Sequence, residues 1–492
     1  MFSIRFREIH GLRAFVNHLF PQYNASEPSK KPCNFQLLHE AGLSRQPAVW
    51  RTTDIDSREL HCMRYVIIGN GVASIGAIEG IRANDPQGEI LVVSEEAFPT
   101  YGRPLISYYL ADKVAERHLP LRPDSFYTDH HVAMKLQSKV TAIDPVTQTL
   151  TTEHGESIAY DRLLLALGGA PYLPAIAGIS GPGVFTFTQR GDVDALRTAV
   201  KQARRVVVVG AGLIALKAAE ALAAMGKEVT LAVRSRLMRS YFDEHASELL
   251  KRHLEQKGLA FAQGHSPQAL LRDENGVLTA LETDKGQLPA DVVIMAAGVR
   301  PQTDLAKTAD INVGLGIQAD DHMRTSALNI FAAGDCVEAA EMLSGSPVVM
   351  PIWPNAFNQG YNAGANMAGA DLKYPGSLNM NSISYWGLPT TSVGMVNPPA
   401  DQGYEVHLES DPARFAYRKL VFKDDRLVGC ILLQDVDMAG FYTGFIRFRI
   451  TLDAKAKDSL LQGRPSPLDW PEPLIQAELK YGGAYAAGEL IA

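Results

Sequence analysis

From residue 63 onward, short apolar runs rich in β-branched residues alternate with longer segments whose apolar residues recur every three or four positions. The short runs predict buried strands, and the longer segments predict amphipathic helices. Strands that alternate with helices predict parallel sheets covered by helices, which is an α/β fold. Two units of strand, glycine-containing turn and helix recur about 140 residues apart.

The pattern changes from about Gly376. The runs 414–422 and 426–433 resemble strands, and they flank Lys423, Asp424 and Asp425, which form a typical hairpin turn. We therefore expect a separate α+β domain over residues 376–492.

The first 62 residues show no clear strand or helix period. Three interpretations remain open: an upstream extension that results from too early a choice of start codon, a targeting segment, and a loosely ordered arm. Arg5, Arg7 and Arg13 favour a targeting segment, whereas Glu8 and the lack of serine enrichment speak against it.

The first apolar run leads directly into the sequence GNGVAS, which starts at Gly69. Gly69 permits a tight turn, and Gly71 leaves room for a pyrophosphate where a Cβ would intrude. The start of the next helix would offer free amides to the phosphates. Ser74 stands where a third glycine is usual. A second apolar run ends at Glu95, a carboxylate suited to bind ribose hydroxyls, so these residues predict a dinucleotide site.

A second turn of the same kind follows the run Arg205–Val209. Its sequence GAGLIA places Gly210, Gly212 and Ala215 at the three key positions, and alanine is an accepted substitute for the third glycine. The two turns together predict two Rossmann-like dinucleotide-binding domains.

The strand expected after the second turn ends without an acid. Val233 closes it, and three arginines follow: Arg234, Arg236 and Arg239. Guanidinium groups bind a 2′-phosphate in bidentate fashion, whereas an acid would repel it, so the pattern favours NADP(H). If these arginines form only a solvated basic face, NADH remains a usable donor.

Composition narrows the class of protein. Hydrophobic residues make up 46% and charged residues 21%, as in folded globular proteins. The net charge of -7 gives no basic field for nucleic acid, and no apolar run reaches the ~18 residues of a membrane span. The four cysteines lie far apart, which argues against a disulfide scaffold, a zinc site or a dithiol redox centre. We expect a cytoplasmic protein without a metal site.

Further motifs follow the turns in a fixed order. They are YGRPL from Tyr101, YDRLLLALG ending at Gly168, AAGVRP containing Gly298, and NIFAAGD ending at Asp335. With these motifs, the chain after residue 62 resembles the two-dinucleotide flavoproteins of the pyridine nucleotide-disulfide oxidoreductase superfamily.

The resemblance implies FAD at the first turn and NADP or NAD at the second. It also implies that Asp335 binds the ribityl chain of FAD, that Arg103 contacts this cofactor near its diphosphate, and that the backbone at Val140 lies near the adenine. Gly168 and Gly298 close the first FAD segment and the NAD(P) segment. For Arg103 a surface salt bridge is the alternative.

The resemblance further implies a domain order. A FAD-binding domain would comprise residues 63–175 and 300–375, with an NAD(P)-binding domain at 176–299 inserted in it. The C-terminal domain is similar to that of rubredoxin reductases and of the flavin portion of the nitrite reductase large subunit. In that group it packs over the flavin and often supports dimerisation, which leaves a homodimer open.

Departures from the superfamily pattern restrict the chemistry. No cysteine lies between Met63 and Asp335, so disulfide reductase chemistry is disfavoured. Ser107 stands near the reactive sulfur of single-cysteine peroxidases, and serine cannot cycle through a sulfenic acid. Lys217 replaces a glutamate usual near the nicotinamide, and Tyr108 replaces a lysine frequent in ferredoxin-reductase-like members. That polar pair of the family is therefore expected to be missing.

The expected function is hydride transfer from NAD(P)H to FAD, followed by electron transfer to a small redox protein, such as rubredoxin or ferredoxin, or to an iron-sulfur partner subunit. One alternative is an NAD(P)H oxidase or quinone reductase with a small acceptor. Another is a FAD-holding redox-sensing or interaction protein with negligible turnover. The chemistry requires no catalytic acid, base or nucleophile from the chain, and the sequence does not identify the acceptor.

Overall fold

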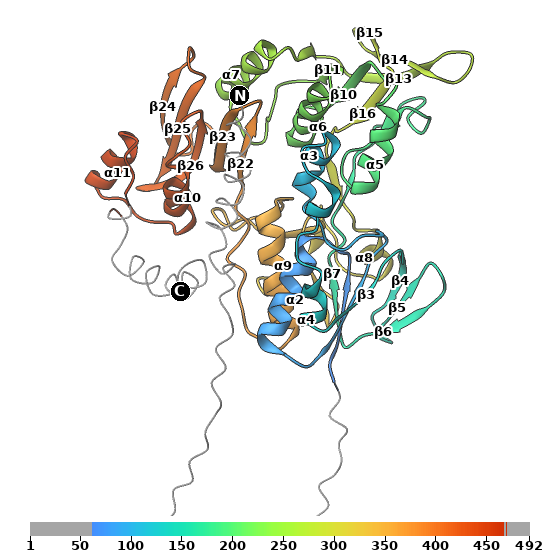
Figure 1. Ribbon diagram of the computed structural model, residues 1–492. Helices are drawn as coiled ribbons and strands as arrows, with labels where there is room; N and C mark the ends of the chain where they lie inside the picture. Colours follow the sequence, from blue (N-terminus) through green and yellow to red (C-terminus); the bar gives the residue numbers. More distant parts are fainter. Residues whose placement is uncertain (1–61, 467–468, 470–492) are drawn as a thin grey trace, which may run out of the picture. The chain divides into compact units, whose positions relative to one another are not determined.

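Two parallel sheets of the same plan form the frame of the protein (Figure 1). The computed structural model describes residues 62–466 and 469, so the interpretations of the preceding segment lie outside the described residues. The strand order is β19-β7-β1-β2-β3 in one sheet and β12-β11-β10-β16-β9 in the other. Every neighbouring pair in both sheets runs parallel, as the alternating pattern predicted.

The first sheet contains the apolar run that precedes the first glycine turn. Its strands are β1 (Arg64–Ile68), β2 (Glu89–Val93), β3 (Val132–Lys135), β7 (Arg162–Leu165) and β19 (Ile330–Ala332). In β1 the first residue is exposed and the next four are buried. A strand apolar on both faces fits a sheet covered on both sides.

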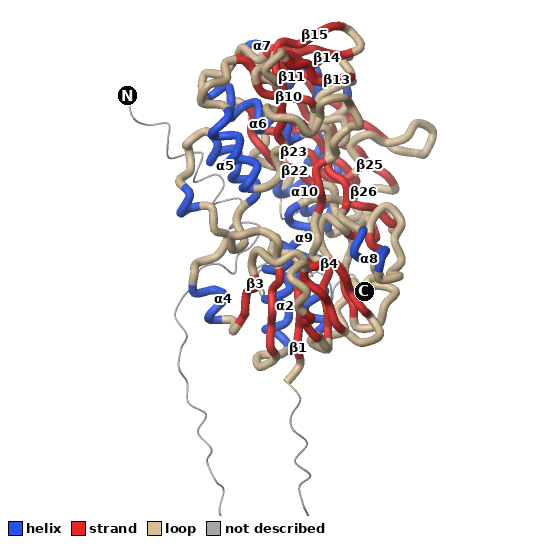
Figure 2. Tube along the Cα trace, turned by 90° about the vertical axis from the view of Figure 1, so that its right-hand side faces the viewer, coloured by secondary structure: helices blue, strands red, loops and turns tan. Residues whose placement is uncertain are grey.

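Two helices of this part of the protein, α2 (Val72–Asn84) and α9 (Trp353–Met367), pack closely against each other (Figure 2). Glycines on both helices permit the approach. A Cβ added at Gly76 would overlap the carbonyl oxygen of Phe357, and one added at Gly364 would overlap that of Ala77. The sequence did not reveal this helix pair, because its two members are nearly 300 residues apart.

The second sheet repeats the plan. Its strands are β9 (Val184–Phe185), β10 (Arg205–Val209), β11 (Glu228–Val233), β12 (Ala260–Gln263) and β16 (Val292–Met295), and its helices are α5 (Arg190–Ala199), α6 (Leu213–Ala224) and α7 (Glu244–Gln256). An antiparallel sheet of β13 (Pro267–Arg272), β14 (Leu278–Thr283) and β15 (Gly286–Pro289) accompanies it.

The C-terminal part is an antiparallel sheet with helices, which confirms the expected α+β character. Its order is β22-β23-β26-β25-β24, with β22 (Met380–Tyr385), β23 (Leu388–Gly394), β24 (Glu405–Asp411), β25 (Ala416–Lys423), β26 (Arg426–Leu433), α10 (Ala439–Arg447) and α11 (Ala454–Leu461). The expected hairpin is present, and Asp424 and Asp425 both have positive φ, as in a type I′ turn.

The remaining elements are short. The strands are β4 (Val140–Asp144), β5 (Thr149–Thr152), β6 (Ser157–Ala159), β8 (Gly169–Pro171), β17 (Val299–Pro301), β18 (Ile317–Gln318), β20 (Val337–Ala340) and β21 (Pro347–Val349). The helical turns are η2 (Arg103–Leu105), α3 (Ile106–Leu110), η3 (Glu116–His118), α4 (Ser125–Asp129) and α8 (Asp304–Thr308). Within the described ranges, no helix has the length and apolarity needed to cross a membrane.

The second Rossmann-like sheet is joined to the C-terminal sheet through a buried ionic cluster. Asp243, the N-cap of α7, accepts hydrogen bonds from the Tyr417 hydroxyl at 2.6 Å and from Lys419 Nζ at 3.0 Å. Burial alone would raise the pKa of the Asp243 carboxyl, but these donors and the Ala246 amide hold it below its usual value.

The expected fold class, two Rossmann-like units plus a C-terminal α+β part, is confirmed. The boundaries near residues 175, 300 and 375 stay a prediction, because Met63–Asp469 cluster as one compact unit. Strands β8 and β17 pair where the chain passes between the two parallel sheets.

The glycine contact between α2 and α9 generates a stability prediction. We expect Gly364→Ala to lower the free energy of unfolding by about 1–3 kcal/mol, because the new methyl group must displace the α2 backbone. The matched control is Gly440→Ala in α10, where a Cβ meets nothing within 4 Å and should stabilise by ~0.5–1 kcal/mol. Urea denaturation measures both, and equal effects would contradict the close-packing argument.

Candidate functional site

Four residues named from the sequence lie at one edge of the first sheet. Gly69, Glu95, Gly168 and Asp335 follow β1, β2, β7 and β19 within three residues of the strand ends. Because the strands are parallel and in register, their carboxyl ends meet at the same edge. The strand order reverses between β1 and β7, because β2 and β3 lie on one side of β1 and β7 and β19 on the other. Ligands of open α/β sheets bind at such a point.

The first glycine turn has the geometry that a phosphate requires. Gly69 has a φ of +106°, and a Cβ there would overlap the carbonyl oxygen of Ala166. A Cβ at Gly71 would meet nothing within 4 Å, so space is open at the start of α2. No side chain caps this helix, which leaves its first amides available to an anion. Ser74 is buried, and its hydroxyl donates to the Gly69 carbonyl at 2.6 Å, so it braces the turn.

Two adjacent carboxylates after β2 point in different directions. Glu95 is exposed, and its side chain lies 4.0 Å from Lys139 Nζ, next to the buried Val140 that begins β4. The structure therefore brings the expected ribose acid beside the expected adenine segment. Glu96 instead faces Arg103.

Arg103 lies between the two parallel sheets. Its guanidinium pairs with Glu96 and donates to the Thr188 carbonyl at 2.9 Å, and Glu96 also accepts from the Tyr101 hydroxyl at 2.7 Å. The Arg103 charge reaches Asp335, where it partly offsets the effect of burial on the carboxyl pKa. Arg103 thus forms a partly exposed ion pair with Glu96, and its expected contact with the cofactor stays a prediction.

Asp335 is half-buried at the carboxyl edge of the first sheet. Burial raises the pKa of its carboxyl, and yet the side chain keeps partial solvent access. The preceding turn is held by α9, because the Gly334 amide donates to Gln359 Oε1 at 2.8 Å. A half-enclosed carboxylate on a fixed turn suits the binding of polyol hydroxyls.

The second sheet presents the second turn in the same way. Gly210 has a φ of +147°, a Cβ at Gly212 would meet nothing within 4 Å, and no side chain caps α6. The Ala215 methyl packs beneath Gly210. Gly298, with a φ of +131°, follows β16 at the same edge.

Arginines line the end of β11. Arg234 and Arg239 are exposed, and Arg236 lies 3.9 Å from Glu244. Across the described ranges no ion pair or side-chain hydrogen bond is found for Arg234. Its guanidinium therefore remains available to a phosphate.

The two glycine-turn units meet where α3 contacts α6. Tyr108 on α3 and Lys217 on α6 are in contact, with Lys217 Nζ 4.8 Å from the centre of the tyrosine ring. Lys217 also pairs with Glu220 on its own helix. The contact between α3 and α6 is therefore one of a cation with an aromatic ring, and the ion pair of Lys217 lies within α6.

Two of the cysteines in the described part of the chain, Cys336 and Cys430, are buried and free. Cys336, beside Asp335, is fully buried, and burial raises the pKa of its thiol to about 12. Cys430 has the same pKa for the same reason. Neither thiol would be ionised near neutral pH, so Cys336 is a small core residue and not a redox group.

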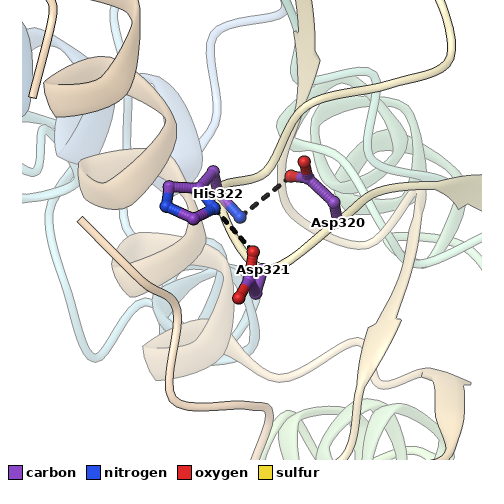
Figure 3. A group of neighbouring side chains, drawn as sticks. All are labelled: Asp320, Asp321 and His322. Carbon is purple, nitrogen blue, oxygen red and sulfur yellow. Dashed lines mark hydrogen bonds and ion pairs between the residues drawn. The ribbon is translucent and has the colours of Figure 1, made fainter. Parts of the chain in front are cut away.

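One group of side chains in the described part of the chain has the spacing of metal ligands (Figure 3). Its members are Asp320, Asp321 and His322, and each already has protein partners. Asp320 accepts from two backbone amides, and His322 contacts Asp321 at 2.5 Å and Asp371 at 2.9 Å. The protein itself satisfies these ligand atoms, so we assign no metal to them.

Sequence motifs missed several residues that shape the site. Glu96 could not be distinguished from Glu95, because both follow the same strand. Ser384 belongs to no motif, and only the fold brings it to Lys217. Gln359 lies in the segment WPNAFNQG, but its contact with the Gly334 amide is seen only in the fold.

Comparison with known proteins supports the geometry. The family model for pyridine nucleotide-disulphide oxidoreductases matches residues 63–360, and the model for the rubredoxin NAD+ reductase C-terminal domain matches residues 380–449. The assimilatory nitrate reductase electron transfer subunit of Bacillus subtilis is 31% identical over 76% of this chain and 48% of its own. The chain therefore spans about half the length of that relative.

Two further proteins match most of their own length. Rubredoxin-NAD(+) reductase of Pseudomonas putida is 30% identical over 64% of this chain and 82% of its own. The structure of an engineered water-forming NADPH oxidase, derived from the Lactobacillus brevis NADH oxidase, is 28% identical with a TM-score of 0.73. It covers 79% of this chain and 92% of the oxidase.

The family uses FAD and NAD(P)H, and the two glycine turns, the uncapped helices and the half-buried Asp335 fit such ligands. This chain belongs to the pyridine nucleotide-disulphide oxidoreductase family and has the rubredoxin reductase type of C-terminal domain.

Proposed function

We propose that this protein is a FAD-dependent NAD(P)H oxidoreductase without a redox-active disulfide, which passes electrons to a small redox protein or an iron-sulfur partner subunit. The observation that carries the proposal is the direct contact between α3 and α6. This contact brings the unit of the first glycine turn against the unit of the second, and neither α3 nor α6 contains a cysteine. Relatives named as a rubredoxin reductase and as an electron transfer subunit support the choice of acceptor.

Separate sets of residues would bind the two cofactors. Gly71 and the start of α2 would receive the FAD pyrophosphate, while Glu95 would bind its ribose and Asp335 its ribityl hydroxyls. Gly212 and the start of α6 would receive the pyrophosphate of NAD(P)H. When bound, FAD supplies the ring that links a two-electron hydride donor to a one-electron acceptor.

We further propose NADPH as the preferred donor. The engineered NADPH oxidase carries an alanine in place of a glycine and, eighteen positions later, an alanine in place of an aspartate, followed by an introduced arginine and an introduced serine. In this chain Ala215, Val233, Arg234 and Ser235 stand in the same order and at the same spacing. The agreement supports a 2′-phosphate site at Arg234, and the part expected of the nearby Arg239 stays a prediction.

Two expectations about the environment of the protein also remain proposals. Buried free thiols at Cys336 and Cys430 favour the reducing cytoplasm. A homodimer is favoured only by the resemblance of the C-terminal domain to that of rubredoxin reductases, in which this domain often supports dimerisation.

The function is tested with purified protein. We expect yellow protein that oxidises NADPH at ordinary enzymatic rates with ferricyanide, and that reduces added rubredoxin or ferredoxin faster than it reduces oxygen. Reoxidation by air faster than by every protein acceptor would identify an oxidase instead. Negligible turnover with ferricyanide would contradict an enzyme altogether.

Removal of the Asp335 carboxylate should deplete the protein of FAD. We expect Asp335→Ala to be purified with little flavin, measured by absorbance near 450 nm, because the ribityl hydroxyls lose their acceptor. Without FAD, the melting temperature of the Asp335→Ala variant should not be lower than that of the wild-type protein. The reason is that burial already disfavours the charged form of the Asp335 carboxyl. The control is Asp304→Ala, whose side chain is fully exposed. Normal flavin content in Asp335→Ala would contradict the ribityl assignment.

Removal of Arg234 should act on one donor only. We expect Arg234→Ala to raise the KM for NADPH about tenfold or more, since a charged hydrogen bond contributes about 1.5–3 kcal/mol, with little change for NADH. Arg204→Ala is the matched control, because Arg204 pairs with Glu228 at the opposite end of the same sheet. Equal effects of Arg234→Ala on both donors would remove the support for a 2′-phosphate site.

A further inference from the structure

The three arginines after β11 lie on one loop, the arginine loop, which comprises residues 234–239. Leu237 and Met238, in its interior, are buried. Met238 has a φ of +50°, a backbone conformation that residues other than glycine rarely adopt. Such a conformation persists only where the surroundings enforce it. The shape of the arginine loop therefore depends on its contacts with neighbouring elements.

Contacts within the second sheet unit hold one part of the arginine loop. The Ser247 hydroxyl of α7 donates to the carbonyl of Leu237 at 2.7 Å. The Met238 amide donates to the carbonyl of Ala211 at 2.8 Å. Because Ala211 belongs to the second glycine turn, the arginine loop is joined directly to the turn that would receive the pyrophosphate.

The C-terminal sheet holds the remainder of the loop and the residues that follow it. Tyr385, the last residue of β22, is fully buried, and its hydroxyl donates to Met238 Sδ at 3.4 Å. Asn397, which follows β23, donates through Nδ2 to the carbonyl of Phe242 at 3.2 Å and to that of Arg239 at 3.5 Å. The ionic cluster with β25 follows directly at the start of α7. A separate sheet thus fixes the far end of the arginine loop.

These contacts influence which guanidinium groups face solvent. The Arg239 carbonyl, which accepts from Asn397, also accepts from the Arg236 guanidinium at 3.4 Å. Arg236 lies 3.9 Å from Glu244 as well, so its side chain is turned back on its own loop. Arg234 and Arg239, at the two ends of the loop, are exposed. An anion that approaches would meet these two residues, whose spacing depends on the fold of the loop between them.

The positions of these guanidinium groups matter for a phosphate. Hydrogen bonds from guanidinium to phosphate oxygens are directional, and a displaced group loses part of them. A loop that had to become ordered on binding would also reduce affinity. Asn397 contacts only backbone carbonyls of the segment, so its effect on a bound phosphate would pass through the loop backbone.

We propose that the C-terminal sheet, through Asn397, positions the arginine loop for the 2′-phosphate and thereby strengthens the preference for NADPH over NADH. The inference rests on the proposed function, because it requires a 2′-phosphate site at Arg234. Asn397 is a positioning residue in this arrangement, since it acts through the loop and not on the ligand. The C-terminal part of the chain thus takes part in the choice of the donor.

Nucleotide binding without turnover tests this role. The nucleotide 2′,5′-ADP carries the 2′-phosphate and no nicotinamide, and ADP lacks both groups. Titration calorimetry on the FAD-containing protein gives the two dissociation constants. We expect wild-type protein to bind 2′,5′-ADP about tenfold or more tightly than ADP. Asn397→Ala should reduce this preference by about three- to fivefold, as for one lost neutral hydrogen bond, and leave the dissociation constant of ADP unchanged.

Steady-state kinetics should show the same selectivity. We expect Asn397→Ala to raise the KM for NADPH about three- to fivefold, with the KM for NADH and kcat for both donors unchanged. Asn275→Ala is the matched control, because Asn275 is an exposed asparagine between β13 and β14 of the same unit. Melting temperature and flavin content report folding.

A combined variant shows whether Asn397 acts through the arginines. When Arg234 and Arg239 are both replaced by alanine, the further change Asn397→Ala should have little effect on the preference for 2′,5′-ADP, because the groups that it positions are absent. A further loss of about three- to fivefold in this background would show that Asn397 acts by another route, and it would overturn the inference.

Two results with the single variant would also overturn the inference. In folded Asn397→Ala, an unchanged preference for 2′,5′-ADP would show that the loop is positioned without Asn397. An equal loss of affinity for both nucleotides would show a general structural role. Failure of the proposed 2′-phosphate site looks different, because then the wild-type protein itself would bind the two nucleotides equally well, and this inference would fail with it.

Discussion

The close contact between α2 and α9 holds the first site together. Because Gly76 and Gly364 have no side chain at the contact, the two helices approach until backbone meets backbone. The same α9 presents Gln359 to the Gly334 amide, which fixes the turn that carries Asp335. The start of α2, next to the first glycine turn, and the half-buried Asp335 are thereby held in fixed positions relative to each other.

The second site depends on a different constraint, which is the burial of charged side chains. Asp243, Lys217 and Glu220 are removed from solvent to varying degrees, and each has a partner in the C-terminal sheet. A buried charge that lost its partner would lower the free energy of unfolding by several kcal/mol. The second parallel sheet and the C-terminal sheet are therefore held in the one arrangement that keeps these charges paired. For the proposed function such rigidity would be useful, because the donor would have to reach the flavin in one orientation.

Residues at strand ends explain why so much of the site was predictable. Gly69, Gly71, Gly210 and Gly212 are recognised because a turn that approaches a phosphate leaves no choice of side chain. Glu95 and Arg234 follow because parallel strands bring their carboxyl ends to one edge. Lys217 was noticed only as a departure from the family, and its ion pair with Glu220, one turn later on the same helix, was not expected.

The sequence by itself determined the period of the strands, the two glycine turns and the absence of cysteine pairs from the junction, because each follows from local chemistry. Tertiary structure alone decided that Glu96 and not Glu95 binds Arg103, that Gln359 supports Asp335, and that Ser384 and Trp386 meet α6. These contacts join residues that are far apart in the chain. They depend on how the elements pack, and packing has no signature in the local amino-acid sequence.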